Sequence, residues 1–421
     1  MTPLSRRNIL GAALVGAAAA TSSGRAALAQ AVATPTGSAG RSAAVDGAFD
    51  IPDGVTLLNN AGTHPLPTLA ARATAQYLAG KSAGTFDPRL RLFGTLAPAR
   101  TRFAALINAA PAEIALVQST LAAENMVVTG LDLPRGRGNV VTEALHYDGA
   151  LYLYRSIESE TLRVRIAPAR DGRIPLESLE ELIDDHTRLV SVSLVSSING
   201  HMHDLKAICD LAHARGALVY ADIIQAAGAV PIDVKAANVD FCGCGSYKWL
   251  MGDCGAGFLY TRKGLLGRVI ERDRWGYLQC DMLEQDPFAT PGAPDWPIHF
   301  RRNEGAAGYF EIGTPAFGVL AGLEASLGLI ASLGVARIQA HITGLLEPLR
   351  RELPKLGYKI MTPPGSAPIL AFHADDPAGL RKRLAARKID VKAAHGVIRV
   401  SPGVFTTPAG IERLLAALKQ D

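Results

Sequence analysis

Two short, largely apolar segments, each followed closely by a charged residue, constrain the fold of this chain most strongly. The segment 217–221 leads directly into Asp222, and the segment 239–244 is followed within a few residues by Lys248. Apolar runs of this length are typical of strands buried on both faces of a parallel sheet. Ligands of such sheets bind outside the carboxyl ends of the strands. The sequence therefore predicts that Asp222 and Lys248 meet at one edge of an α/β sheet.

A carboxylate paired with a lysine suits the chemistry of pyridoxal phosphate. This cofactor needs an amine that holds its aldehyde as a Schiff base and an acid that keeps its pyridine nitrogen protonated. Taken alone, an Asp that ends a strand is usually a turn residue, and a Lys in a loop is usually a solvated charge. The interpretation therefore depends on the rest of the chain.

Several motifs in order along the chain support it. They are DIIQ at 222–225, SYKWL at 246–250 with GDCGAGFLY after it, FEIGTP at 310–315 and VIRVSP at 397–402. Together they resemble the class V aminotransferases, a branch of the fold type I pyridoxal-phosphate enzymes, from about Leu57 to Leu418. The resemblance implies an α/β fold, with a large domain built on a mainly parallel sheet and a smaller C-terminal α+β domain.

The resemblance gives three residues a catalytic role. Lys248 would hold the cofactor and move the proton of the substrate Cα. Asp222 would pair with the pyridine nitrogen so that the ring can accept electrons. His146, which follows a strand expected at 139–142, would stack on the ring and assist proton transfer.

The resemblance also implies a set of cofactor contacts. These are Thr120, Leu121, His146, Ser197, Asp222, Gln225, Ser246, Tyr247, Lys248 and Thr314. Thr120 and Leu121 precede a helix expected over 122–130, and free amides at a helix start favour an anion such as phosphate. Leu121 stands where a second threonine is usual, so it would offer only its amide. Ser197 and Tyr247 also depart from the family pattern, which commonly has Asn and His there.

Substrate and partner contacts follow from three further segments. Arg399 would grip the α-carboxylate of an amino acid, because a guanidinium donates two parallel hydrogen bonds to a carboxylate. Asn60 and His64, in the N-terminal LNNAGTH segment, would lie near the substrate. Thr314 would reach the phosphate bound by the other subunit of a homodimer. Residues 270–305 are expected to line the mouth of the site.

The reaction stays open at this level, with an aminotransferase favoured. An epimerase resembling isopenicillin-N epimerase, a carbon–sulfur lyase and a retired enzyme that only binds are the alternatives. Desulfuration through a protein persulfide is disfavoured, because it needs a cysteine shortly before the carboxylate-binding arginine and no cysteine follows Cys280. The five cysteines are too irregular for a disulfide framework. Cys242, Cys244 and Cys254 have no fourth ligand at a fitting spacing, so no metal site is expected.

The first part of the chain predicts export. Residues 1–29 combine Ser5-Arg6-Arg7 with an apolar run and the small-residue site Ala27-Leu28-Ala29, as in a twin-arginine signal peptide. We therefore expect contact with the twin-arginine export machinery and a periplasmic or secreted protein. Loss of three arginines with this segment would lower the formal charge from +4 to +1, which gives no reason to expect a nucleic-acid partner. Residues 30–48 are expected to be a disordered leader, 49–315 an N-terminal arm and large cofactor-binding domain, and 316–421 linking helices and the small domain.

Overall fold

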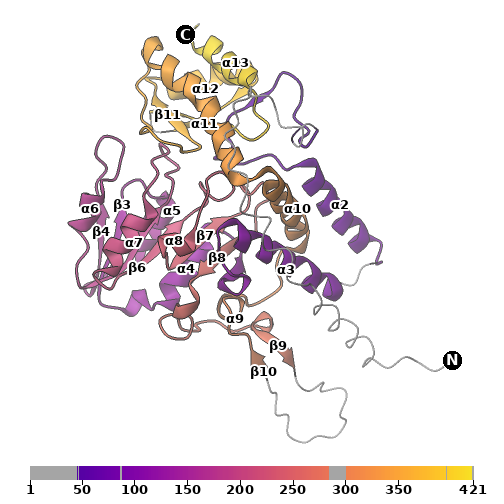
Figure 1. The fold of residues 1–421 in the computed structure, drawn as a ribbon, viewed down its shortest axis with the longest axis vertical. Coiled ribbons are helices and arrows are strands. Elements are labelled where there is room, and N and C mark those ends of the chain that lie inside the picture. Colours follow the sequence, from indigo (N-terminus) through magenta and orange to yellow (C-terminus); the bar gives the residue numbers. More distant parts are fainter. Residues whose placement is uncertain (1–44, 46, 86–87, 284–299, 395, 420–421) are drawn as a thin grey trace, which may run out of the picture. The chain divides into compact units, whose positions relative to one another are not determined.

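The computed structural model describes residues 45, 47–85, 88–283, 300–394 and 396–419 (Figure 1). The expected signal peptide and nearly all of the expected leader lie outside the described residues. The segment 284–299 of the expected active-site mouth lies outside them as well.

A seven-stranded sheet forms the centre of the fold, in the order β2-β8-β7-β6-β5-β3-β4. The strands are β2 (Ile114–Val117), β8 (Gly257–Thr261), β7 (Phe241–Gly245), β6 (Leu218–Asp222), β5 (Thr187–Ser193), β3 (Gly138–Glu143) and β4 (Leu162–Ala167). The pairs from β7 to β4 are parallel, and β8 runs antiparallel to both β7 and β2. The prediction of a mainly parallel sheet is confirmed.

Helices cover both faces of this sheet, as the long apolar runs require. They are α4 (Thr120–Gly130), α5 (Asp148–Ile157), α6 (Leu176–Glu180), α7 (Leu205–His213) and α8 (Val234–Ala237). Along β6 the side chains alternate, so Val219 packs with α7 on one face and Tyr220 packs with α4 and α5 on the other. Asp222 follows Tyr220 by two residues and therefore points to the α4 and α5 face.

Two glycines allow close packing beside β6. A Cβ at Gly243 of β7 would lie 1.9 Å from the Tyr220 hydroxyl, so only glycine leaves room for that ring. Gly228 has φ +95°, and a Cβ there would lie 2.3 Å from the Trp249 carbonyl oxygen. Both contacts hold the ends of β6 and β7 close together, which brings Asp222 near the Lys248 segment.

The C-terminal part contains a separate antiparallel sheet. Its strands are β11 (Leu370–His373), β14 (Val397–Val400) and β13 (Lys392–Ala394), in that order. The helices around it are α11 (Val335–Glu352), α12 (Pro377–Ala386) and α13 (Pro408–Leu418), drawn in orange to yellow in Figure 1. The N-terminal arm joins this part, since β1 (Thr56–Leu57) pairs in parallel with β12 (Ile389–Asp390).

The apolar helix α10 (Phe317–Leu333) packs between the two parts against α2 (Thr68–Ser82) and α3 (Pro88–Leu106). Phe103 of α3 stacks on Phe258 of β8 with ring centroids 4.0 Å apart, which fixes α3 on the sheet. The remaining elements are β9 (Cys280–Leu283), β10 (Phe300–Arg302), α9 (Ala307–Phe310) and short 3-10 turns at Pro111–Glu113, Leu133–Arg135, Lys263–Leu265, Tyr277–Gln279 and Pro354–Leu356.

No single helix in the described ranges has the length and apolar character needed to cross a membrane. Phe317–Leu333 and Val335–Leu356 pass that test only as a pair, and they are bent by 78° where they meet.

Candidate active site

Asp222 and Lys248 lie together at the carboxyl end of the central strands. Asp222 pairs in register with Ser193 of β5 and Gly243 of β7, and Lys248 follows β7 directly. Their residues are 4% and 8% exposed, so both charged groups are buried. The Asp222 carboxylate accepts a hydrogen bond from the Ile224 amide at 2.9 Å.

Burial perturbs both groups. It raises the pKa of Asp222 to about 6, against the opposing positive charge of His146 and the Ile224 amide bond. It lowers the pKa of Lys248 to about 8, with the charge of Asp222 acting to raise this pKa and the charge of Arg399 acting to lower it. A buried acid and a buried amine with shifted pKa values in one place are typical of a functional site.

His146 lies on the sheet next to this pair and is fully buried. Its Nδ1 lies 2.8 Å from the Ser193 hydroxyl and accepts from the Tyr147 amide at 2.8 Å. Its Nε2 lies 3.0 Å from the hydroxyl of Ser191. Because Ser193 is the register partner of Asp222, these bonds hold the imidazole beside the Asp222 strand.

The start of α4 forms the anion side of the site. The helix begins at Thr120, two residues earlier than expected, with Ser119 as its cap accepting from the Ala122 amide. The Thr120 hydroxyl accepts from the Gly245 amide at 2.8 Å, so the helix start touches the end of β7 just before Lys248. The proton of the Thr120 hydroxyl remains available for donation to a ligand. The first amides of a helix have no partner within it, and Thr120 and Leu121 present theirs at this point.

Arg399 of β14 closes the site from the C-terminal sheet. Its Nη1 donates to the Ser197 carbonyl at 2.6 Å, and its Nη2 lies 3.4 Å from the Asn59 Oδ1. Its Nε is buried without a hydrogen bond, and among the described residues no carboxylate pairs with it. Burial lowers the pKa of Arg399 to about 10. A half-buried guanidinium that has a buried, unbonded Nε and no anionic partner is suited to an anionic ligand.

Asn59, which the sequence reasoning missed, is therefore the asparagine next to Arg399. Asn60 instead donates to the Ser401 carbonyl at 2.8 Å. His64 is enclosed by the rings of Phe49 and Phe405, and burial lowers its pKa to about 4. Asn60 and His64 thus join the arm to the C-terminal part, and the His64 amide also donates to the carbonyl of Tyr247, the neighbour of Lys248, at 3.1 Å. Their contact with a substrate stays a prediction. The position of Asn59 in the same LNNAG motif is the sequence feature that could have indicated its contact with Arg399.

The side chains of two expected cofactor contacts, Ser246 and Gln225, form hydrogen bonds within the protein. The Ser246 hydroxyl donates to the Asp253 carbonyl, so this residue shapes the loop after Lys248, and its contact with a phosphate stays a prediction. The Gln225 Nε2 donates to the Ala61 carbonyl at 3.0 Å and its Oε1 accepts from the Trp249 indole at 3.0 Å. One amide hydrogen of Gln225 remains for a ligand. The carbonyl of Ser197 accepts a hydrogen bond from Arg399, and its side chain forms no hydrogen bond with the described residues.

Tyr247 lies beside Lys248, whereas Thr314 lies on the surface next to Tyr277. The Tyr247 ring is half-buried, with its centroid 5.6 Å from the Lys248 Nζ. Thr314 is exposed, and its hydroxyl lies 2.6 Å from that of Tyr277. Ile312, two residues before Thr314, and Trp275, two residues before Tyr277, are also exposed, so large apolar side chains lie on the surface around Thr314. A subunit interface remains a prediction here.

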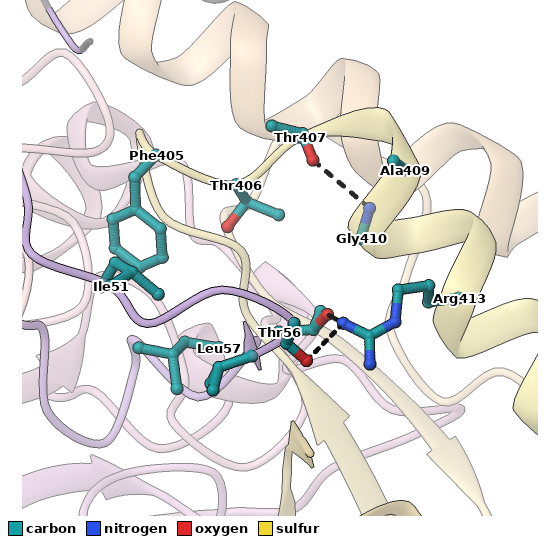
Figure 2. A pocket seen from close by; sticks show the side chains of 11 residues that line it. Ile51, Thr56, Leu57, Phe405, Thr406, Thr407, Ala409, Gly410 and Arg413 are labelled. Atoms are coloured by element: carbon teal, nitrogen blue, oxygen red, sulfur yellow. Dashed lines mark hydrogen bonds between the residues drawn. The ribbon is translucent and has the colours of Figure 1, made fainter. Parts of the chain in front are cut away.

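Neither the cysteines nor the cavity near the N-terminal arm contributes to the site around Lys248. All five cysteines are free, and in the described ranges no cluster of three His, Cys, Asp or Glu is placed to hold a metal. A cavity of about 300 Å³ lies between the arm and the start of α13, where Arg413 donates to the Gly54 carbonyl and Thr56 hydroxyl (Figure 2). None of the residues around Lys248 lines it.

The residues around Lys248 fit pyridoxal phosphate. The buried amine, the buried acid, the start of α4 and the unpaired guanidinium of Arg399 match an aldehyde, a pyridine nitrogen, a phosphate and a substrate carboxylate. Fold and site together define a pyridoxal-phosphate enzyme of fold type I. The family model described as aminotransferase class-V matches residues 55–414, so the chain belongs to this family and pyridoxal phosphate is its cofactor.

Related proteins carry different activities. The uncharacterized aminotransferase YcbU of Bacillus subtilis is 31% identical over 321 residues, which cover 73% of this chain and 79% of that protein. A protein of Methanothermobacter thermautotrophicus described as "Probable cysteine desulfurase" is 31% identical over 297 residues, 69% of this chain and 70% of its own length.

Solved structures share the fold. The cysteine desulfurase CsdA of Escherichia coli has a TM-score of 0.77 at 22% identity, covering 89% of this chain and 96% of that chain. The cystine C–S lyase C-DES in complex with cysteine persulfide has a TM-score of 0.76 at 25% identity, covering 87% and 97%.

Proposed function

We propose that this enzyme acts at the Cα of an amino acid and transfers its amino group. The observation that carries the proposal is the half-buried guanidinium of Arg399, which has no carboxylate partner among the described residues and lies within electrostatic reach of Lys248. An amino acid whose carboxylate lies on Arg399 has its Cα close to that amine. This arrangement favours removal of the Cα proton, the step with which transamination, epimerisation and β-elimination all begin.

Each residue has a definite task in this proposal. Arg399 binds and orients the substrate carboxylate, and Lys248 takes the Cα proton on its Nζ. Asp222, which is ionised above about pH 6, would pair with the pyridine nitrogen of the cofactor and keep it protonated. The cofactor, when bound, supplies the electron sink. His146 presents a planar imidazole beside Asp222, and Ser191 and Ser193 fix its orientation.

A carbon–sulfur lyase is the second candidate, supported by the similarity to C-DES. The absence of any cysteine after Cys280 also separates this chain from enzymes that need a cysteine nucleophile in that region.

Product analysis separates the two candidates. The loaded enzyme is incubated with single amino acids, with and without a 2-oxo acid as amino acceptor. Transamination forms a new amino acid and a keto acid without free ammonia. Ammonia and pyruvate from cystine or cysteine indicate the lyase, and inverted substrate without either product indicates an epimerase. No product from any substrate would contradict the enzymatic proposal.

We further propose export through the twin-arginine route, supported by the Ser5-Arg6-Arg7 motif and the Ala27-Leu28-Ala29 site. Protein recovered from the periplasm should begin at Gln30. Retention of the whole segment in the cytoplasmic fraction would contradict this proposal.

A further inference from the structure

A buried carboxylate that the sequence did not single out lies behind His146. Glu124 sits on α4, one turn after Thr120, and is 1% exposed. Its Oε1 accepts hydrogen bonds from the Tyr154 and Ser191 hydroxyls, both at 2.7 Å, and lies 3.5 Å from the His146 Nε2. A buried carboxylate is costly unless donors and a positive charge compensate it. His146 is the group of positive charge closest to it in this cluster.

The hydrogen bonds form a directed chain from the imidazole to the carboxylate. The His146 Nδ1 accepts from the Tyr147 amide, so in the neutral ring the proton lies on Nε2. Nε2 then donates to the Ser191 hydroxyl, which in turn donates to Glu124. A second proton on Nδ1 can be donated to the Ser193 hydroxyl at 2.8 Å, but it faces the Tyr147 amide hydrogen that the neutral ring accepts. These hydrogen bonds therefore favour the neutral ring with its proton on Nε2, and the nearby charge of Glu124 is what favours the imidazolium.

We propose that Glu124 is a positioning residue, which orients the His146 imidazole through Ser191 and supplies the negative charge that the ring faces from α4. The inference rests on the proposed site, where His146 lies beside Asp222. Glu124 itself contacts neither the substrate nor the cofactor in this proposal. It acts through His146.

The electrostatics agree with this role. Burial lowers the pKa of His146, but the nearby carboxylates, Glu124 first among them, together outweigh burial and raise this pKa. Asp222 of β6 and Glu143 of β3 act in the same direction with smaller effect. The titratable groups that share this buried region come from four elements: Glu124 of α4, Glu143 of β3, Tyr154 of α5, and Tyr220 and Asp222 of β6.

The discriminating variant is Glu124→Gln. The amide keeps an oxygen that accepts from Tyr154 and Ser191, so the packing is preserved while the charge is lost. The pKa of His146 is measured by NMR in the protein without cofactor, and His146→Asn identifies the resonance among the 10 histidines. We expect Glu124→Gln to lower this pKa by roughly one to three units, the range seen when a neighbouring opposite charge is removed. An unchanged pKa in the folded variant overturns the proposal.

Two further variants separate charge from packing. Tyr154→Phe removes a hydrogen bond to Glu124 but leaves the charge, so the pKa of His146 should not fall. Ser191→Ala breaks the hydroxyl bridge and should lower that pKa by less than Glu124→Gln does. If Glu124→Gln fails to fold, an unchanged pKa in Ser191→Ala overturns the proposal by itself.

The loaded enzyme gives a second readout. The pH profile of kcat/KM should have one limb that reports His146, recognised because His146→Asn abolishes it. In Glu124→Gln this limb should move to lower pH, by the same amount as the pKa of His146 measured by NMR. The KM for the amino acid should stay close to that of the wild type, because Arg399 is untouched. A limb that does not move contradicts the role of Glu124. If no variant and no wild-type enzyme turns over any amino acid, the proposed function fails, while the NMR result still decides the role of Glu124.

Discussion

At the scale of single residues, burial moves the pKa values of Asp222 and Lys248 toward each other. The carboxyl group titrates at about 6 and the amine at about 8. Near neutral pH the carboxylate is therefore mostly ionised, while the amine has a far larger neutral fraction than a solvated lysine with a pKa near 10.4. An ionised carboxylate is needed to pair with a protonated pyridine nitrogen, and a neutral amine is needed to attack the aldehyde of the cofactor.

Asp222→Asn tests the carboxylate. The variant keeps the size of the side chain and an oxygen for the Ile224 amide, so cofactor should still bind. Loss of the charge weakens the hold on a protonated ring nitrogen. We expect kcat to fall by roughly 10²-fold or more, the size typical of lost electrostatic stabilisation in a buried site. Steady-state kinetics at saturating cofactor check this, and near-normal turnover would remove Asp222 from the mechanism.

The pH dependence of cofactor capture tests the amine. Only the neutral amine attacks an aldehyde, so the rate at which protein without cofactor binds pyridoxal phosphate should rise with pH and level off above about 8. The positive charge of Arg399 lowers the pKa of Lys248, so Arg399→Gln should raise that pKa and move the midpoint to higher pH.

The exposed Arg163 of β4 offers a matched control for the charge change. Arg163→Gln should leave the midpoint in place. A wild-type rate that keeps rising toward pH 10 would show that the amine is not perturbed.

At the scale of elements, Gly228 fixes the distance between the end of β6 and the Lys248 segment. Gly228 and Gly255 have similar backbone angles, φ +95° and +92°, but a Cβ at Gly255 would meet nothing within 4 Å. Gly255→Ala should therefore cost only the backbone strain, about 1–3 kcal/mol. Gly228→Ala should cost about 1–3 kcal/mol more, because its Cβ collides with the Trp249 carbonyl.

Chemical denaturation of both glycine variants measures this difference. The excess cost of Gly228→Ala should be accompanied by weaker cofactor binding, because the Lys248 segment must move. Equal stability losses in the two variants would show that the contact with Trp249 does not constrain the site.

The elements also show what sequence reasoning could predict. The order of strands and helices around Asp222 and Lys248 follows from local apolar runs, and the structure confirms it. Contacts between distant segments could not be predicted that way. Gln225 is bonded to Ala61, 164 residues away, and Asn60 to Ser401, 341 residues away. Glu124 gave no signal, because its burial depends on donors from α5 and β5.

At the scale of the whole molecule, we propose a homodimer that shares its active sites through Thr314. The hydroxyl of Thr314 is exposed at the surface, close to Trp275 and Tyr277, which are also exposed. Thr120 is the hydroxyl donor that this chain places at the start of α4, and a buried phosphate needs many donors. Thr314→Ala should therefore weaken cofactor affinity without unfolding the chain.

Mixed dimers test this arrangement. If Thr314 serves the partner's site, a dimer of Lys248→Ala and Thr314→Ala subunits has one site with both defects and one with neither. Co-expression at equal levels should restore activity corresponding to about a quarter of the wild-type sites. Activity that never exceeds that of the separate variants, or an active monomer, would contradict a shared site.

Borohydride reduction of the loaded enzyme tests the central claim most directly. Reduction fixes the cofactor covalently to the amine that holds it, and digestion followed by mass spectrometry locates that amine. The label should lie on Lys248 alone, and Lys248→Ala should lose both the label and turnover. A label on any other lysine, or an unlabelled wild-type protein, would contradict the assignment of this site.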